Sequence, residues 1–228
     1  MISCAGSDDD VTKMLIEFIK QKMDDGENWD IEKDLKVFSE QLLKEDTQKY
    51  IGLFSSMSLT DFGKAISGAL MRRKVTDHKA VAIAQGILKT IESNNIGFKS
   101  FFQGTKGIPG FFMRIANGGL GAASTNSYCD KAINDDVWYS KTLEESEKNK
   151  IDSIKDRIAE VYLSIIPMIR EYLDLTLLIK SLYPLSLLSR IEKETQTIKD
   201  EENIVFISDF YRKIHEQLLN EPVPFIYQ

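Results

Sequence analysis

The sequence predicts an all-α protein. Apolar residues recur at intervals of three and four over most of the chain, which is typical of amphipathic helices. Three Ser or Thr residues precede an acidic residue by three positions where such patterns begin, a spacing typical of helix capping boxes. No segment shows sustained alternation of apolar and polar residues, so we do not expect a sheet. We therefore predict a bundle of seven to nine helices in two halves that share a core.

The first half, residues 11–95, begins with two helices. The first follows the spacing of Ser7 and Asp10 and ends at Gly26, a residue type common after helices. Its apolar stripe consists of Val11, Met14, Leu15, Phe18, Ile19 and Met23. Asp30 is expected to cap the second helix, and Thr47 to begin a short one.

Two further helices are expected before residue 95. One begins at the Ser58 and Asp61 box and is closed by the basic run at residues 72–74, which complements the helix dipole. Gly63 and Gly68 weaken that helix, which predicts close approach of another backbone. Thr76 or Asp77 then caps a helix whose apolar positions cover much of its circumference, so we expect burial on more than one side.

A segment rich in Gly and Phe, residues 96–127, is expected to join the halves. No Asp or Glu occurs from Ser93 to Cys129, and seven of the 13 glycines lie between Ile96 and Ala122. Residues 98–102 are compatible with one helical turn. Pro109 is placed to start a short helix that the sequence Asn-Gly-Gly at 117–119 ends.

The second half, residues 128–221, contains the longest helical pattern. A box at Thr142 and Glu145 precedes an apolar stripe that continues to Tyr172, with a kink expected at Pro167. Residues 173–188 are nearly all apolar and are predicted to form the central core element, which Pro184 ends or bends. Residues 192–203 form either an exposed helix or a loop. A last helix at 205–219 precedes an extended tail at 222–228.

Charge and composition limit the classes of function. The net charge of −6 and a pI near 5.1 argue against nucleic-acid binding, which requires a cationic face. No run of about 18 residues is apolar and free of charge, so no membrane-spanning helix is expected. Two cysteines, Cys4 and Cys129, are too few for a disulfide framework, although a single bridge between them stays open.

The first ten residues form a polar, flexible N-terminal segment. Ser3 and Cys4 followed by a polar stretch resemble the end of a bacterial lipoprotein signal, in which the Cys carries the lipid. The cationic start and apolar region of a whole signal are absent from these residues. The chain is therefore expected to be either an ordinary cytoplasmic protein or a cell-surface protein tethered through Cys4.

Catalytic, cofactor and metal motifs are sparse. The two histidines, His78 and His215, lack partners at metal-binding spacing, and both are expected to face solvent or cap a helix. The sequence Gly-Thr-Lys-Gly at 104–107 lacks the full pattern of a phosphate-binding loop and has no preceding strand. We predict no catalytic residue, no bound cofactor and no metal site.

The acid-free segment is the candidate interaction surface. It combines aromatic and cationic side chains, namely Phe98, Lys99, Phe101, Phe102, Lys106, Phe111, Phe112 and Arg114. The leading hypothesis is a non-enzymatic helical protein that presents a groove or surface to a protein partner, in the manner of an antigen or adhesin if Cys4 is lipidated. The alternatives are peripheral membrane binding through residues 96–123, and an enzyme with an unrecognised site. The opposite expectation is that Phe101, Phe102, Phe111 and Phe112 are buried and fill the core between the two halves.

Overall fold

The chain is all-helical in the part that the structure describes. The computed structural model describes residues 9–24, 26, 30, 33–34, 36–37, 40, 54, 56–207, 210 and 214. Its regular elements there are six α-helices and three short 3₁₀ turns, with no strand. The chain divides into two compact units, one made of Met1–Ser67 and Ile179–Gln228 and the other of Gly68–Leu178. The absence of strands confirms the predicted all-α class for the described residues.

The first unit shows why its helices begin where they do. Helix α1 spans Asp9–Asp24, and Gly26 follows it with a φ of 69°. Helix α4 (Leu59–Ser93) starts with the predicted capping box, in which the Ser58 amide donates to Asp61 at 2.9 Å and the Asp61 amide donates to Ser58 Oγ at 3.1 Å. Hydrogen bonds from Ser58 hold the pKa of Asp61 below its ordinary value. Asp30 likewise accepts from the Lys33 amide at 3.1 Å, as expected of a cap.

The glycines of α4 do not serve the predicted purpose. A Cβ on Gly63 would meet only the methyl group of Met14, at 3.5 Å, and one on Gly68 would meet no described atom within 4 Å. The prediction that another backbone approaches both glycines is therefore wrong for the described residues.

The core of the first unit includes side chains from α1, α4 and α8. Among its buried residues are Phe18, Phe62, Ile66, Ile179, Leu182, Tyr183, Leu187, Leu188 and Ile191.

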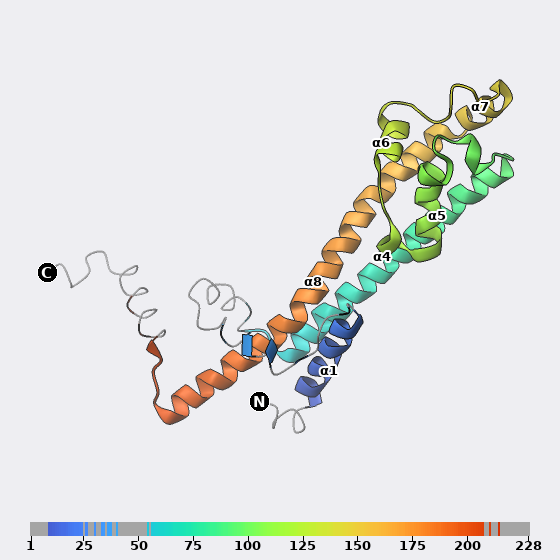
Figure 1. Cartoon of the computed structure of the whole chain (residues 1–228). Coiled ribbons are helices and arrows are strands. Elements are labelled where there is room, and N and C mark those ends of the chain that lie inside the picture. Colours follow the sequence, from blue (N-terminus) through green and yellow to red (C-terminus); the bar gives the residue numbers. More distant parts are fainter. Residues whose placement is uncertain are drawn as a thin grey trace, which may run out of the picture. The chain divides into compact units, whose positions relative to one another are not determined.

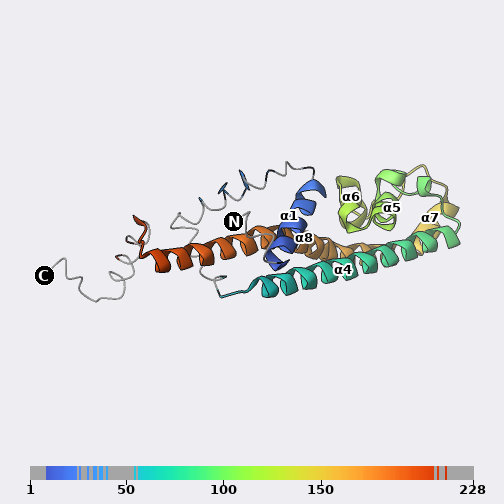
Figure 2. The same ribbon diagram turned by 90° about the horizontal axis from the view of Figure 1, so that it is seen from below.

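The second unit is built on α4 and α8 (Lys155–Glu202), which run side by side (Figures 1 and 2). Helices α5 (Ile108–Gly118) and α6 (Ser127–Asn134) pack along this pair, and α7 (Glu145–Asp152) precedes α8. The turns η2 (Phe98–Ser100), η3 (Gly104–Lys106) and η4 (Leu120–Ala122) link α4 to α5 and α5 to α6. Gly119 ends α5 with a φ of 67°, and Pro109 stands in its first turn, as predicted.

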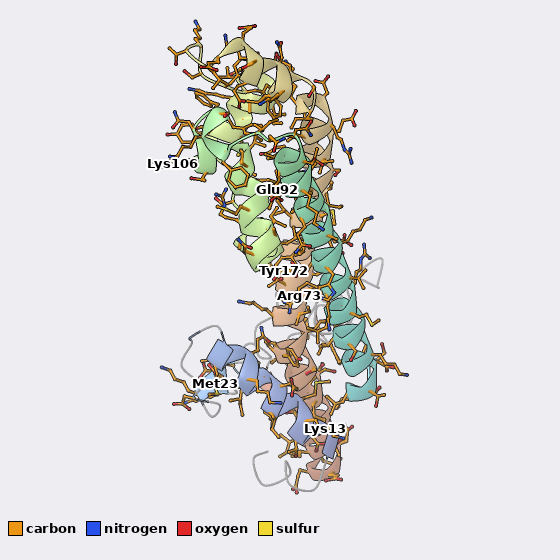
Figure 3. The ribbon with its side chains drawn as sticks, turned by 90° about the vertical axis from the view of Figure 1, so that its right-hand side faces the viewer. Lys13, Met23, Arg73, Glu92, Lys106 and Tyr172 are labelled. Atoms are coloured by element: carbon orange, nitrogen blue, oxygen red, sulfur yellow. The ribbon has the colours of Figure 1, made fainter. Side chains whose placement is uncertain are left out.

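Helix α4 continues through the basic run that was expected to end it. Residues 72–74 favour helix, and Arg72 and Arg73 both reach across to α8. Arg72 pairs with Glu171 at 2.5 Å, and Arg73 lies 5.8 Å from the ring centroid of Tyr172 (Figure 3). The break at residues 72–74 and the cap at Thr76 or Asp77 are therefore wrong.

The C-terminal elements also differ from the prediction. Glu145 begins α7 without a side-chain cap, because the Thr142 hydroxyl pairs with Ser140 Oγ at 2.9 Å and not with the helix. Helix α8 includes both Pro167 and Pro184 and continues to Glu202, so neither proline ends it. The helical alternative for residues 192–202 is confirmed, while a kink at Pro167 stays a prediction.

Residues 173–188 do not form one central core element. Leu173 and Leu177 are 52% and 64% exposed, whereas Leu182 and Leu187 are buried in the first unit. The boundary between the units falls within this stretch, between Leu178 and Ile179, and also between Ser67 and Gly68. The segment at 96–127 lies inside the second unit. The helices predicted to start at Thr47 and Val205 lie largely outside the described residues, so the count of seven to nine stays a prediction.

Two helical glycines test the close packing of the second unit. A Cβ on Gly110 in α5 would overlap the carbonyl oxygen of Thr105, while one on Gly86 in α4 would meet no described atom within 4 Å. Gly110→Ala is therefore expected to lower the free energy of unfolding by about 1–3 kcal/mol through overpacking. The control Gly86→Ala should raise it by up to about 1 kcal/mol, through helix propensity alone. Chemical denaturation measures both, and equal effects would contradict the described packing.

Candidate functional site

The structure separates the candidate interaction surface into buried and exposed members. Phe101, Phe111 and Phe112 are 3%, 0% and 0% exposed and belong to the core of the second unit. The Phe111 ring contacts Phe112 edge to face at 5.3 Å and lies 4.7 Å from the ring of Tyr162. These three phenylalanines therefore fill the core and do not form an exposed surface.

The other members lie nearer to solvent. Phe98 is half-buried against the core, and Phe102 stacks edge to face on Tyr128 at 6.1 Å. Arg114 is half-buried, and its guanidinium donates to the Ser124 carbonyl at 2.7 Å. Only Lys99 and Lys106 are exposed, and Figure 3 shows Lys106 near the outer side of the loop region. Of the eight candidate residues only the two lysines are exposed, so the phenylalanines among them offer little apolar area for insertion into a membrane.

Glycines allow the segment to fold onto itself. A Cβ on Gly107 would overlap the carbonyl oxygen of Phe102, as one on Gly110 would overlap that of Thr105. These two backbone contacts bring the turn η3 directly against the start of α5. Sequence reasoning found the glycine cluster but not its purpose, because close approach depends on which carbonyl lies opposite each glycine.

An aspartate of α4 holds the turn η4 in place. Asp77 Oδ1 accepts from the Leu120 amide at 2.6 Å, and a Cβ on Gly119 would lie 2.5 Å from the same oxygen. The carboxylate therefore satisfies a backbone donor in a part of the loop that only glycine fits. Asp77 caps an element 43 residues away in sequence and not its own helix. No local sequence signal could have identified this partner.

A network of side chains lies at the junction of α7 and α8. The Tyr139 hydroxyl donates to Asp152 at 3.0 Å, and Lys155 pairs with Asp136 at 3.0 Å and with Asp152 at 3.1 Å. The hydrogen bond to Asp152 raises the pKa of Tyr139, and those to Asp136 and Asp152 raise the pKa of Lys155. Both shifts favour the protonated forms, so neither group is suited to act as a base at neutral pH.

A groove of about 250 Å³ in the first unit lies between the start of α4 and residues 186–193 of α8. Two buried serines line it, Ser186 and Ser189, and their hydroxyls donate to the carbonyls of Tyr183 and Phe54. Lys193 at its edge donates to the Met57 carbonyl at 2.8 Å. Each serine hydroxyl therefore donates its hydrogen bond to a backbone carbonyl, whereas a catalytic serine would have to donate to a base.

The residues expected to matter for metals and modification are now placed. His78 is exposed on α4, while His215 and Cys4 lie outside the described residues. Cys129 is fully buried, and burial raises the pKa of its thiol. Within the described ranges no three His, Cys, Asp or Glu side chains are grouped as a metal site would require. None of the described helices is both long enough and apolar enough to cross a membrane.

Comparisons with known proteins provide no relative. No family model, no curated protein and no solved structure matches this chain.

The contact between Asp77 and the Leu120 amide should stabilise the second unit. Asp77→Ala is expected to lower the free energy of unfolding by about 1–3 kcal/mol, because it leaves a buried amide without an acceptor. The exposed Asp135 provides the matched control, and Asp135→Ala should change stability by less than about 0.5 kcal/mol. Urea titrations compare the variants. Identical midpoints for Asp77→Ala and Asp135→Ala would show that the bond contributes nothing.

The raised pKa of Tyr162 predicts how the free energy of unfolding changes at alkaline pH. Burial raises its pKa from 10.0 to about 12, so the folded state keeps the proton longer than the unfolded state does. The resulting stabilisation is complete below pH 10 and is lost as the pH rises from 10 towards 12. Tyr162→Phe keeps the ring but cannot ionise, so its free energy of unfolding should fall less over this range. An equal fall in the free energy of unfolding of both proteins between pH 10 and 12 would contradict the assignment of this effect to Tyr162.

Proposed function

We propose that this chain is a non-enzymatic helical protein that binds a protein partner through an exposed face of its long helices. The supporting observation is a pair of apolar strips in the second unit. Met71 and Val75 on α4 are 71% and 58% exposed, and Leu173 and Leu177 on α8 are 52% and 64% exposed. Each pair is separated by four residues, which places its members together on one helix face.

Single exposed apolar residues are common, but adjacent ones on a helix are typical of recognition surfaces. The proposal moves the interaction surface from the candidate residues at 98–114 to the helices, because Phe101, Phe111 and Phe112 are used in the core. Lys99 and Lys106 remain as exposed members of the earlier candidate surface. A surface-tethered form of the protein depends on Cys4 and stays a hypothesis.

Site-specific photo-crosslinking in cells that produce the protein tests the proposal. A crosslinking amino acid is placed separately at Val75, Leu177 and Lys106, all exposed in the structure. A discrete protein adduct is expected at Val75 or Leu177, because these side chains would lie within the interface. The absence of protein adducts at all three positions would contradict a protein-binding function.

A further inference from the structure

Helix α4 has a second face, opposite to the one that forms the core. The core face consists of Ala69, Thr76, Ala80, Ala84, Ile87 and Ile91, all buried. The opposite face consists of Met71, Val75, His78, Ala82, Gln85 and Lys89, all exposed and all within the second unit. In Figure 2 one side of α4 has no described helix along it.

The spacing of these exposed residues is that of a coiled-coil seam. They follow one another at intervals of four, three, four, three and four residues, which is the heptad spacing of a and d positions. Three of the six positions, Met71, Val75 and Ala82, are apolar, and His78, Gln85 and Lys89 are polar. From Met71 to Lys89 the seam is about 27 Å long at 1.5 Å per residue, or about five helical turns.

Charges beside the seam between Met71 and Lys89 are of one sign, and the acidic Glu92 occupies the next heptad position after Lys89. Lys74 and Lys79 occupy the flanking g and e positions, where charges select the partner helix. Neither they nor Lys89 form an ion pair with any described residue. The only acidic residue of α4 between Asp61 and Glu92 is Asp77, whose carboxylate is turned to the Leu120 amide.

From this geometry we infer that the exposed seam of α4 binds an acidic amphipathic helix of a partner protein. The inference rests on the proposed function and names the class of partner. Apolar side chains of that helix would cover Met71 and Val75, and glutamates at its e and g positions would pair with Lys74 and Lys79. A stable protein interface requires both contributions, because exposed ion pairs alone are weak.

Three other occupants fit the seam less well. A second copy would place Lys74 and Lys79 against the same lysines, and like charges repel. A lipid surface requires Trp, Phe or Leu on the inserted face, and this face has none of them. Nucleic-acid recognition favours arginine, but Arg72 pairs with Glu171 and Arg73 contacts Tyr172.

Binding of designed peptides to the full chain tests the inference. The probe is a labelled peptide of about three heptads with Leu at a and d and Glu at e and g, and the control peptide has Lys in place of Glu. Fluorescence anisotropy should show binding of the Glu peptide, weakening at high salt, and at least about tenfold weaker binding of the Lys peptide. Equal affinity for both peptides would overturn the inference.

Charge reversals in the protein localise the site. The double variant K74E/K79E should lose at least about tenfold affinity for the Glu peptide and gain affinity for the Lys peptide. The matched control K131E/K141E makes the same charge change on exposed lysines outside both candidate surfaces and should leave both affinities unchanged. Circular dichroism confirms that each variant keeps its helical content. Loss of Glu-peptide binding in K131E/K141E to the same extent would overturn the assignment to α4.

Vesicles containing phosphatidylserine, duplex DNA and sedimentation of the free protein provide the remaining comparisons. We expect no binding to the first two that depends on Lys74 and Lys79, and no self-association that depends on them. If the Glu peptide does not bind, vesicle binding, DNA binding or self-association that depends on these lysines would overturn the inference. The seam would then be assigned to a lipid surface, a nucleic acid or a second copy of the chain, respectively. Crosslinked adducts at Leu177 or Lys106 without Glu-peptide binding would remove the α4 seam and leave the protein-binding function standing.

Discussion

Close backbone contacts at glycine hold the second unit together. The carbonyls of Phe102 and Thr105 occupy the space that side chains on Gly107 and Gly110 would need, and the Asp77 carboxylate lies against Gly119. These contacts fold the acid-free segment into a small, dense structure in which Phe101, Phe111 and Phe112 share a core with residues of α4 and α8. Because Phe111 and Phe112 have no exposed area, the apolar character of this segment stabilises the fold and is not available to a partner.

That arrangement decides which side of α4 remains exposed. The core uses Thr76, Ala80 and Ile87, and residues displaced by two positions from a buried one lie about 200° around the helix. His78, Ala82 and Lys89, which follow these three residues by two positions, are therefore on the side of α4 opposite to the core. Arg72 and Asp77 lie at the edges of the core face, where they pair with Glu171 and with the Leu120 amide. The acidic protein thus presents a cationic strip on one helix.

Local signals in the sequence predicted part of the fold. The capping box at Ser58 and Asp61 could be predicted because both partners lie within one helical turn. The helix end at Gly119 could be predicted because a helix often ends at a residue with a positive φ, which glycine adopts easily. The similar spacing of Thr142 and Glu145 does not form a capping box, because the Thr142 hydroxyl pairs with the Ser140 hydroxyl. Pro184 did not end α8, since the buried residues on both sides of it stabilise a helix more than one lost hydrogen bond weakens it.

The candidate site was harder to predict than the fold. An acid-free aromatic segment has the same composition whether it is a core or a surface, and only the contacts of Phe101, Phe111 and Phe112 distinguish the two. The exposed seam of α4 was hidden in the sequence because the helix break predicted at residues 72–74 separated Met71 from His78 and the residues after it. The burial of Ala80, Ala84 and Ile87 was needed to show which apolar residues remain outside.

Hydroxyl-radical footprinting read by mass spectrometry tests this division of α4 and the aromatic segment most directly. Oxidation rates of individual side chains in the native protein are divided by the rates in the unfolded chain. We predict that Met71 reacts nearly as fast in the folded as in the unfolded protein, while Phe111 and Phe112 are protected by about tenfold or more. Strong protection of Met71 together with rapid oxidation of Phe111 and Phe112 would contradict the account.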